Sequence, residues 1–352
     1  MMNTEIKTAQ HIKERYQQFK DHNSKVRIRE AAKKLGVSEA ELLSTSIGEG
    51  VVRLEGNWAD FILQCRDLGR IMALTRSEGC VLEHKGTFQK ISIHGSAPHQ
   101  VATVIGPIEQ RIFFSNWKFG FAAEIQGVRG LMKSFQFFDQ AGQAIMKIYL
   151  QKESNEDVFE QLKNEYKALD QMADLDIEAI EVPEYTTDID EAAFRKEWEE
   201  MKDTHAFFGM LKRYKLHRQE ALRKIGDKWA YRVDRLVVRD ILEKAAEQEL
   251  PIMVFAGNRG NIQIHQGKVK NLHQIDNWFN VMDPDFVMHL NEDTIDEAWV
   301  VHKNTDDGVV SSLELFDPSG ELIAQYFGLR KPGIPQNAAW KKLMDALPKR
   351  SL

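Results

Sequence analysis

The segment at residues 203–211 reads DTHAFFGML and holds residue types that suit a metal-binding helix start. Asp203 or Thr204 can cap a helix, which leaves His205 in the first helical turn. There the positive end of the helix dipole disfavours protonation, and the neutral imidazole is the form that binds a metal ion. The segment therefore predicts His205 as a metal ligand.

Gly209 lies one helical turn after His205, on the same face of the expected helix. Glycine inside a helix costs roughly 1 kcal/mol relative to alanine, so its presence needs a reason. One reason is room for a flat macrocycle beside the imidazole, with Phe208 as an apolar wall. An ordinary histidine at a helix start, with Gly209 at a close helix contact, fits the same spacing, and spacing alone favours this second interpretation.

The chain contains an internal repeat. Residues 41–54 align with residues 219–232, and both share an Ile-Gly-acid core, at a shift of 178 positions. His84 and His265, each two residues before a glycine, match at a shift of 181, and residues 138–142 match 316–320 at 178 again. The shift carries His205 back to Arg27, so the first copy lacks an equivalent ligand. We therefore expect one functional site in two similar domains, with a cleft where they meet.

Each copy opens with helical spacing and continues with alternating, β-rich segments. Ser38 followed by Glu41 indicates a helix start, and residues 135–146 and 312–327 have the pattern of β-hairpins. These patterns predict an α+β fold made of two similar domains, each with a large antiparallel sheet and helices. The expected divisions are 1–170 for the first repeat, 171–200 for an acidic linker with a helix, and 201–352 for the repeat that carries the ligand.

Composition narrows the class of protein. The 352 residues include 47 basic and 53 acidic side chains, and a net charge of -6 argues against a broad phosphate-binding face. The two cysteines have no zinc-ligand spacing, which fits a reducing compartment. No run approaches the roughly 20 apolar residues that a membrane span needs, so we expect a cytoplasmic protein without membrane insertion. The familiar nucleotide-binding, metalloprotease and hydrolase motifs are absent.

Residues 27–42 provide an alternative function, because they have the pattern of a helix-turn-helix. A DNA-binding regulator is the corresponding hypothesis. The would-be recognition helix begins with Glu39 and carries Glu41, and these acids repel phosphates. Packing is therefore the favoured interpretation, and binding of nucleic acid is not expected.

Four segments together resemble a known family. They are residues 203–211 (DTHAFFGML), 111–117 (RIFFSNW), 298–317 (AWVVHKNTDDGVVSSLELFD) and 325–333 (QYFGLRKPG). In their order along the chain, these segments are similar to the HemS/HmuS family of haemin-degrading and haem-transport proteins. The resemblance covers nearly the whole chain, including its duplication. The resemblance implies large antiparallel sheets with helices, and b-type haem held in a cleft between sheet and helices.

The resemblance also implies roles for individual residues. His205 would bind the haem iron, and Arg111 would approach the opposite face of the haem, where a donor also has a catalytic role. The remaining cleft and propionate contacts would come from Phe208, Gly209, Arg218, Lys303, Gln325, Phe327 and Arg330. Some members carry tyrosine just before the glycine of the last motif, where this chain has Phe327.

Two activities fit this resemblance, since members are described both as carriers and as enzymes. The protein would accept imported haem and pass it to a partner, or degrade it oxidatively and release iron. Degradation would make it a haem monooxygenase that needs electrons from outside. The expected partners are a haem-uptake transporter, a haem oxygenase or an electron-donating reductase. We expect His84 to be structural, with a second haem contact there as the alternative.

Overall fold

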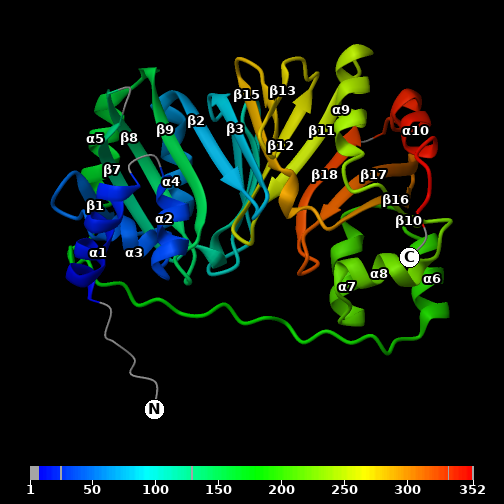
Figure 1. Ribbon diagram of the computed structural model, residues 1–352, viewed down its shortest axis with the longest axis horizontal. Coiled ribbons are helices and arrows are strands. Elements are labelled where there is room, and N and C mark those ends of the chain that lie inside the picture. The colour runs from blue at the N-terminus through cyan, green and yellow to red at the C-terminus, as the bar shows by residue number, and fades with distance from the viewer. Residues whose placement is uncertain (1–7, 24–25, 128–129, 332, 351–352) are drawn as a thin grey trace. The chain divides into compact units, whose positions relative to one another are not determined.

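The computed structural model describes residues 8–23, 26–127, 130–331 and 333–350. The chain divides into two compact units (Figure 1). Unit 1 comprises Met1–Thr75, His84–Glu181 and Asn258–Ile262, and unit 2 comprises Arg76–Glu83, Val182–Gly257 and Gln263–Leu352. Two short segments therefore depart from a simple division in sequence order: Arg76–Glu83 belong to unit 2, and Asn258–Ile262 belong to unit 1.

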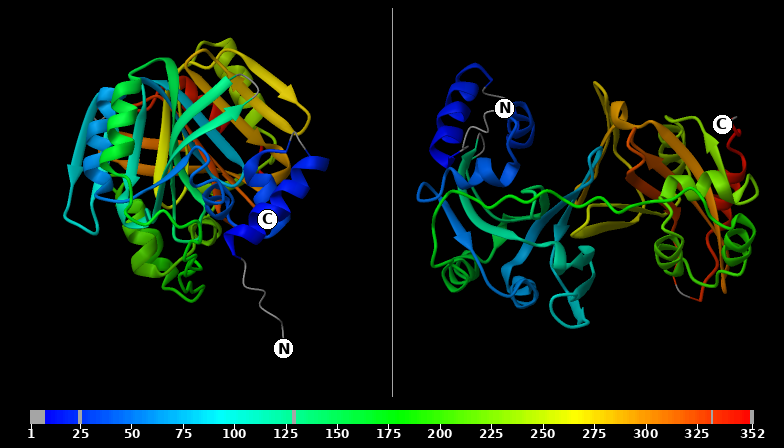
Figure 2. Two further views of the ribbon diagram at one scale, coloured as in Figure 1. Left: turned by 90° about the vertical axis from the view of Figure 1, so that its left-hand side faces the viewer. Right: turned by 90° about the horizontal axis from the view of Figure 1, so that it is seen from below.

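Unit 1 begins with three helices, which are gathered in one group (blue in Figure 2), and continues into antiparallel strands. Five strands are hydrogen-bonded in the order β1-β7-β8-β9-β2, and three others in the order β6-β5-β4. The elements are α1 (Ala9–His22), α2 (Ile28–Leu35), α3 (Glu39–Ser44), β1 (Val51–Leu54), α4 (Trp58–Gln64), β2 (Gly69–Arg76), β4 (Lys90–His94), β5 (Val101–Ile105), β6 (Glu109–Phe113), β7 (Phe119–Gly127), β8 (Gly130–Phe138), β9 (Ala144–Ser154) and α5 (Glu156–Glu165).

Unit 2 repeats this plan with strand orders β10-β16-β17-β18-β11 and β15-β14-β13. Besides β2, whose last residue Arg76 belongs to unit 2, the strands β3 (Cys80–Gly86) and β12 (Asn261–Gly267) have residues in both units. The other elements are α6 (Glu191–Glu199), α7 (Ala206–Tyr214), α8 (Arg218–Ile225), β10 (Ala230–Val233), α9 (Val238–Glu247), β11 (Ile252–Gly257), β13 (Leu272–Ile275), β14 (Trp278–Met282), β15 (Phe286–Asn291), β16 (Glu297–Thr305), β17 (Gly308–Phe316), β18 (Leu322–Gly328) and α10 (Ala338–Asp345). The predicted α+β class with large antiparallel sheets is confirmed.

The register of the central strands reproduces the internal repeat. In unit 2, Glu314 pairs with Trp299 on β16 and with Gln325 on β18. In unit 1, Gln136 pairs with Phe121 on β7 and with Lys147 on β9. Each of these three positions is shifted by 178 residues, so the sequence repeat is also a repeat of hydrogen-bonding register.

Turn glycines and helix starts are repeated as well. Gly142, between β8 and β9, and Gly320, between β17 and β18, both have positive φ, of 70° and 84°. A Cβ atom on Gly142 would lie 2.2 Å from Oγ of Ser38, and one on Gly320 would lie 2.9 Å from Cε1 of His217. Ser38 and His217 are the N-caps of α3 and α8. In each unit, a hairpin turn therefore packs closely against the start of the corresponding helix.

The strands of unit 2 bury side chains on both faces, because neighbouring residues point to opposite sides. One face, with Val300, Leu313 and Tyr326, packs in a core that includes residues of α9 and α10. The other face, with Trp299 and Val301, packs in a core that includes residues of α6, α7 and α8. The second face therefore lies against the helix that follows His205.

The structure argues against a DNA-reading role for residues 27–42. α2 ends at Gly36 in the left-handed conformation, and α3 follows with the predicted capping box between Ser38 and Glu41. The side of α3 that includes Glu39, Ala40 and Leu42 is buried. A helix that turns this side toward the core does not present it to a DNA groove.

The predicted acidic linker contains one helix, α6, and is preceded by α5. α5 and α6 bound residues 166–190, which are mostly extended and without regular elements. His84 on β3 and His265 on β12 are both buried, and His265 stacks on Phe286 with ring centroids 3.7 Å apart. Both histidines therefore occupy core positions of strands. None of the helices in the described ranges has the length and apolar character that crossing a membrane requires.

Candidate functional site

His205 is the N-cap of α7, one residue before the first helical turn in which the sequence placed it. Its side chain is 89% exposed. The ring Nδ1 lies 2.7 Å from Oδ1 of Asp203, and the backbone N–H of His205 donates to the same oxygen at 3.0 Å. Since Nδ1 is engaged, Nε2 is the ring nitrogen left to bind an external ligand.

Asp203 provides the negative charge beside this imidazole. The hydrogen bond from the backbone N–H of His205 lowers the pKa of Asp203, and the His205 side chain and the positive charge of Arg330 lower it further. Asp203 is therefore an ionised acceptor near neutral pH. A carboxylate that accepts a proton from one imidazole nitrogen orients the ring and raises the basicity of the other nitrogen.

The exposed side of α7 next to His205 is open and apolar. Phe208 is 75% exposed, whereas Phe207 is buried in the core of unit 2. Among the residues that the structure describes, a Cβ atom on Gly209 would meet only Nη1 of Arg213, at 3.6 Å, an ordinary contact with a flexible side chain. A close helix contact therefore does not explain Gly209, and the helix surface beside His205 is free to accept a flat ligand.

A buried carboxylate organises the polar residues that the sequence singled out. Glu314 on β17 is 0% exposed. Arg218 donates to it twice, from Nε and Nη2, each at 2.8 Å. Lys303 donates from Nζ at 2.9 Å and Gln325 from Nε2 at 3.0 Å. The structure thus brings Arg218, Lys303 and Gln325 together around one acid that the sequence did not identify.

The charges of this cluster do not cancel. Burial by itself raises the pKa of Glu314, but Arg218 and Lys303 outweigh burial and hold that pKa far below its usual range. Burial lowers the pKa of Lys303 to about 8, against the opposing effect of Glu314. With Glu314 ionised and both bases protonated, the cluster has one positive charge in excess. Such a site attracts an anionic group.

Phe207 links this cluster to α7. The ammonium of Lys303 lies 4.4 Å from the centroid of the Phe207 ring, and the guanidinium carbon of Arg218 lies 5.0 Å from it. Both are cation–π distances. The helix that begins after His205 is therefore fixed to the charged cluster through the side chain two residues further on.

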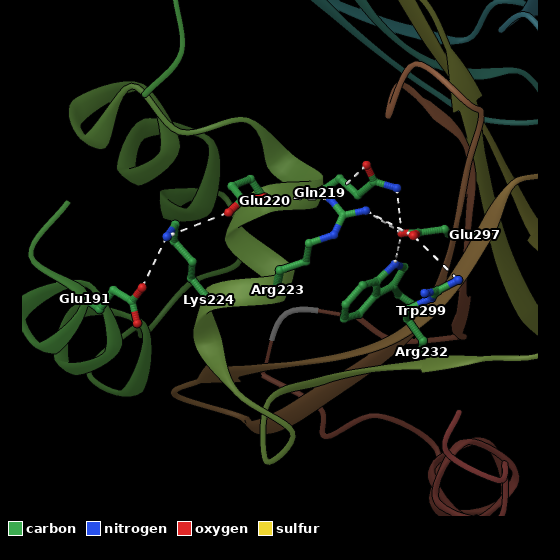
Figure 3. Close-up of polar contacts among 8 residues, drawn as sticks. All are labelled: Glu191, Gln219, Glu220, Arg223, Lys224, Arg232, Glu297 and Trp299. Atoms are coloured by element: carbon green, nitrogen blue, oxygen red, sulfur yellow. Dashed lines mark hydrogen bonds and ion pairs between the residues drawn. The ribbon is translucent and has the colours of Figure 1, made fainter. Parts of the chain in front are cut away.

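Arg218 is the first residue of α8, and a second buried acid fixes that helix (Figure 3). Glu297 on β16 accepts hydrogen bonds from Gln219 at 2.7 Å, from Arg223 at 3.0 Å and from the indole of Trp299 at 2.9 Å. On the far side of α8, Lys224 pairs with Glu191 of α6 at 3.2 Å. These contacts hold α8 against the sheet and so position Arg218.

The strand positions that the sequence assigned to the site share one face of β18. Phe327 pairs in register with Ser312 and Met253, two residues along from the pairing of Gln325 with Glu314. The ring of Phe327 contacts Phe255 edge to face, with centroids 5.3 Å apart. Both phenylalanines are only partly buried, so they extend the charged cluster with an apolar surface.

Arg111 belongs to unit 1, on β6, and not to the unit that carries His205. Its guanidinium donates to Glu109 at 2.9 Å and to the carbonyl oxygen of Gln110 at 3.1 Å. About one third of the side chain is exposed. The expected approach of Arg111 to a haem face stays a prediction.

Three contributors were missed in the sequence: Glu314 as an anchor, Phe207 as a link, and Asp203 as a partner of the imidazole ring. A signal for Glu314 existed in the repeat. The shift of 178 residues places Gln136 at the position of Glu314 and Ile125 at that of Lys303. A pair of charges present in one copy alone marks that copy as specialised.

Comparison with known proteins places this geometry in a wider group. A family model described as the haemin-degrading HemS.ChuX domain matches the chain twice, at residues 36–166 and 215–347, which confirms the duplication. His205 lies between the two matched segments. The hemin transport protein HemS of Yersinia enterocolitica is 34% identical over 334 residues, covering 94% of this chain and 95% of that protein. The hemin transport protein HmuS of Yersinia pestis is 32% identical over 337 residues, covering 95% and 96%.

Solved structures show the same arrangement. The haem-loaded form of PhuS, a heme-binding protein from Pseudomonas aeruginosa, matches with a TM-score of 0.94 and 40% identity, covering 98% of this chain and 100% of PhuS. The heme-degrading enzyme ChuS of Escherichia coli O157:H7 matches with a TM-score of 0.91 and 31% identity, covering 96% and 99%. The fold is therefore shared over its full length with proteins described both as haem binders and as haem-degrading enzymes.

Proposed function

The chain belongs to the family of haemin-degrading HemS proteins, and on this premise we propose that it binds haem with His205 as the iron ligand. The proposal rests on two observations: the His205 ring is held at one nitrogen, and the helix surface at Gly209 is open. Nδ1 of His205 is held by Asp203 and the side chain is 89% exposed, while Gly209, four residues on, adds no side chain to the helix surface. A haem iron requires one such axial nitrogen from the protein, because its macrocycle supplies the others.

The residues around His205 fit a flat, largely apolar ligand with acidic edges. Phe208 offers an exposed ring, and Gly209 leaves the helix surface without a side chain. Phe327 adds a partly exposed apolar position on β18. The haem-loaded relative of 40% identity supports haem as the ligand of this shared fold.

We assign the propionate contacts to Arg218 and Arg330. Arg218 uses Nε and Nη2 on Glu314, which leaves its Nη1 to donate to a second carboxylate. Arg330 is close enough to Asp203 to lower the pKa of that acid, so it lies near the His205 end of the site. Lys303 and Gln325 are committed to Glu314 and act through the charge and shape of the cluster.

Unit 2 holds all of these residues, and we propose that residues 201–352 form the ligand-bearing repeat and residues 1–170 the supporting one, with the acidic segment 171–200 between them. When bound, haem supplies the iron that reacts with oxygen. In the degrading role, Arg111 serves as the hydrogen-bond donor on the second haem face. In the carrier role, the exposed position of His205 favours release to a partner.

Both roles require partners. A haem-uptake transporter supplies the ligand, and either a haem oxygenase receives it or a reductase donates the electrons that degradation consumes. We propose a cytoplasmic location, which the two free, buried thiols Cys65 and Cys80 support.

Titration of the haem-free protein with haemin tests the ligand assignment. The wild-type protein is expected to give a Soret band that saturates at one haem per chain. His205→Ala is expected to shift that band and weaken binding, whereas His273→Ala, which removes an exposed histidine on β13, leaves both unchanged. Equal spectra and affinities for wild type and His205→Ala would show that His205 is not the ligand.

A second experiment separates the two roles. The haem-loaded protein is reduced under air with an external electron donor, in the presence of catalase. Loss of the Soret band with formation of an open-chain tetrapyrrole establishes degradation, and Arg111→Ala is then expected to slow it. A Soret band that persists under these conditions establishes the carrier role.

A further inference from the structure

Asp203 contacts His205 in two ways that have different consequences. Its Oδ1 accepts the backbone N–H of His205 at 3.0 Å, which stabilises the turn just before α7. The same oxygen lies 2.7 Å from Nδ1 of the imidazole. The first contact stabilises the backbone turn, whereas the second constrains where the ring carries its proton.

A neutral imidazole has one protonated nitrogen and one free electron pair. Next to an ionised carboxylate, the proton is stabilised on the nearer nitrogen, because a proton donor there forms a hydrogen bond and an electron pair there meets the carboxylate charge. With Asp203 at Nδ1, the proton is therefore held on Nδ1, and the electron pair is on Nε2.

We infer that Asp203 is a positioning residue that holds His205 as the Nδ1–H tautomer and keeps the electron pair of Nε2 directed to the haem iron. This inference rests on the proposed function, since it concerns the same site. The exposure of the His205 ring makes the contribution necessary. With 89% of the side chain exposed, packing does little to hold the ring, and the bond to Asp203 is its principal restraint.

Two variants separate the charge of Asp203 from its hydrogen bond to the backbone N–H of His205. Asp203→Ala removes both the charge and the acceptor of the backbone N–H. Asp203→Asn keeps an oxygen that can accept this N–H but removes the charge. Asp190→Asn is the matched control, because Asp190 caps α6 through the N–H of Ala193 at 3.0 Å.

The first readout uses the haem-free protein. Nitrogen NMR of 15N-labelled histidine at about pH 9, well above the ordinary histidine pKa of about 6.5, reports which ring nitrogen of His205 is protonated. The wild type and Asp190→Asn are expected to show the Nδ1–H tautomer. Asp203→Ala is expected to shift the population toward Nε2–H.

The second readout uses the haem-loaded protein. Loss of such an outer partner typically weakens metal binding by about 10- to 100-fold, which is the loss expected for haem binding by Asp203→Ala. Asp203→Asn is expected to weaken binding and to make the haem reduction potential more positive, since a less basic ligand stabilises ferric iron less. Asp190→Asn is expected to change neither quantity.

Two outcomes would overturn the inference. In the first, the tautomer of His205 is the same in wild type and Asp203→Ala. In the second, Asp203→Asn matches wild type in haem affinity and reduction potential, which would leave Asp203 with a role in the backbone turn alone. Failure of the proposed function is distinguishable from both, because it requires that His205→Ala retain the wild-type haem spectrum and affinity.

Discussion

Removal of the carboxylate of Glu314 should destabilise unit 2 strongly. Glu314→Gln leaves Lys303, which is 5% exposed in its side chain, without a counter-charge. Arg218 also loses at least one of its two hydrogen bonds, because the amide nitrogen of glutamine cannot accept one. Breaking a buried ion pair by removing one partner costs about 3 to 5 kcal/mol. At roughly 1.4 kcal/mol per tenfold change, the folding equilibrium constant falls by about 10²-fold to about 4 × 10³-fold.

A double variant tests whether the loss comes from the stranded charge. Glu314→Gln combined with Lys303→Met removes both buried charges and keeps a side chain of similar length against Phe207. Replacement of a buried pair by apolar residues is often close to neutral. We therefore expect the double variant to recover most of the stability that Glu314→Gln loses.

Urea unfolding provides the assay. Trp198, Trp229, Trp299 and Trp340 lie in the cores of unit 2, whereas Trp58 and Trp117 belong to unit 1. Tryptophan fluorescence therefore follows unit 2, together with a contribution from unit 1 that should be the same in wild type and variants. Glu200→Gln is the control, because Glu200 and Lys196 form an exposed pair of 3.9 Å whose loss costs less than about 1 kcal/mol. A free energy of unfolding for Glu314→Gln within about 1 kcal/mol of wild type would refute the idea that the cluster depends on this acid.

The charged cluster and the exposed side of α7 give three further predictions. The pKa of Glu314 is lowered in the folded state, so its contribution to stability is present above the ordinary carboxyl range and is lost as the pH falls below it; acid unfolding of wild type and Glu314→Gln should show a steeper pH dependence for wild type. Gly209→Ala should raise the stability of the haem-free protein by up to about 1 kcal/mol in thermal unfolding. Gly209→Leu should fold as the wild type does, but its haem affinity in a titration should be lower. Phe208→Ser should leave the melting temperature nearly unchanged, because the ring is 75% exposed, and should reduce haem affinity in a titration; a melting temperature lowered as far as by a core substitution would show that the ring is structural.

The fold was accessible from the sequence because its signals are local or repeated. The capping pair of Ser38 and Glu41 forms as its spacing predicts. The matching turns at residues 138–142 and 316–320 indicate the duplication, and the structure extends it to strand register and to the glycine contacts at helix starts. Sequence order did not predict that residues 76–83 and 258–262 belong to the other unit, since such exchanges depend on tertiary packing.

The site was accessible only in part. The types and spacing of His205, Phe208 and Gly209 indicated a ligand beside a bare helix surface, and the structure leaves that surface open. The bond between Arg218 and Glu314 was not accessible, because the two residues lie 96 positions apart and no local pattern connects a buried strand acid to a helix start. Only comparison of the two repeats sets Glu314 and Lys303 apart from their counterparts. The role of Phe207, whose ring joins the two bases to α7, was not accessible either.

The most direct test of the central claim is the position of the iron in crystals of the haem-loaded protein, measured by anomalous diffraction at the iron absorption edge. We expect one iron per chain, within bonding distance of Nε2 of His205, with Nδ1 still held by Asp203. An iron bound to a different residue, or bound to Nδ1 of His205 with the contact to Asp203 broken, would contradict it.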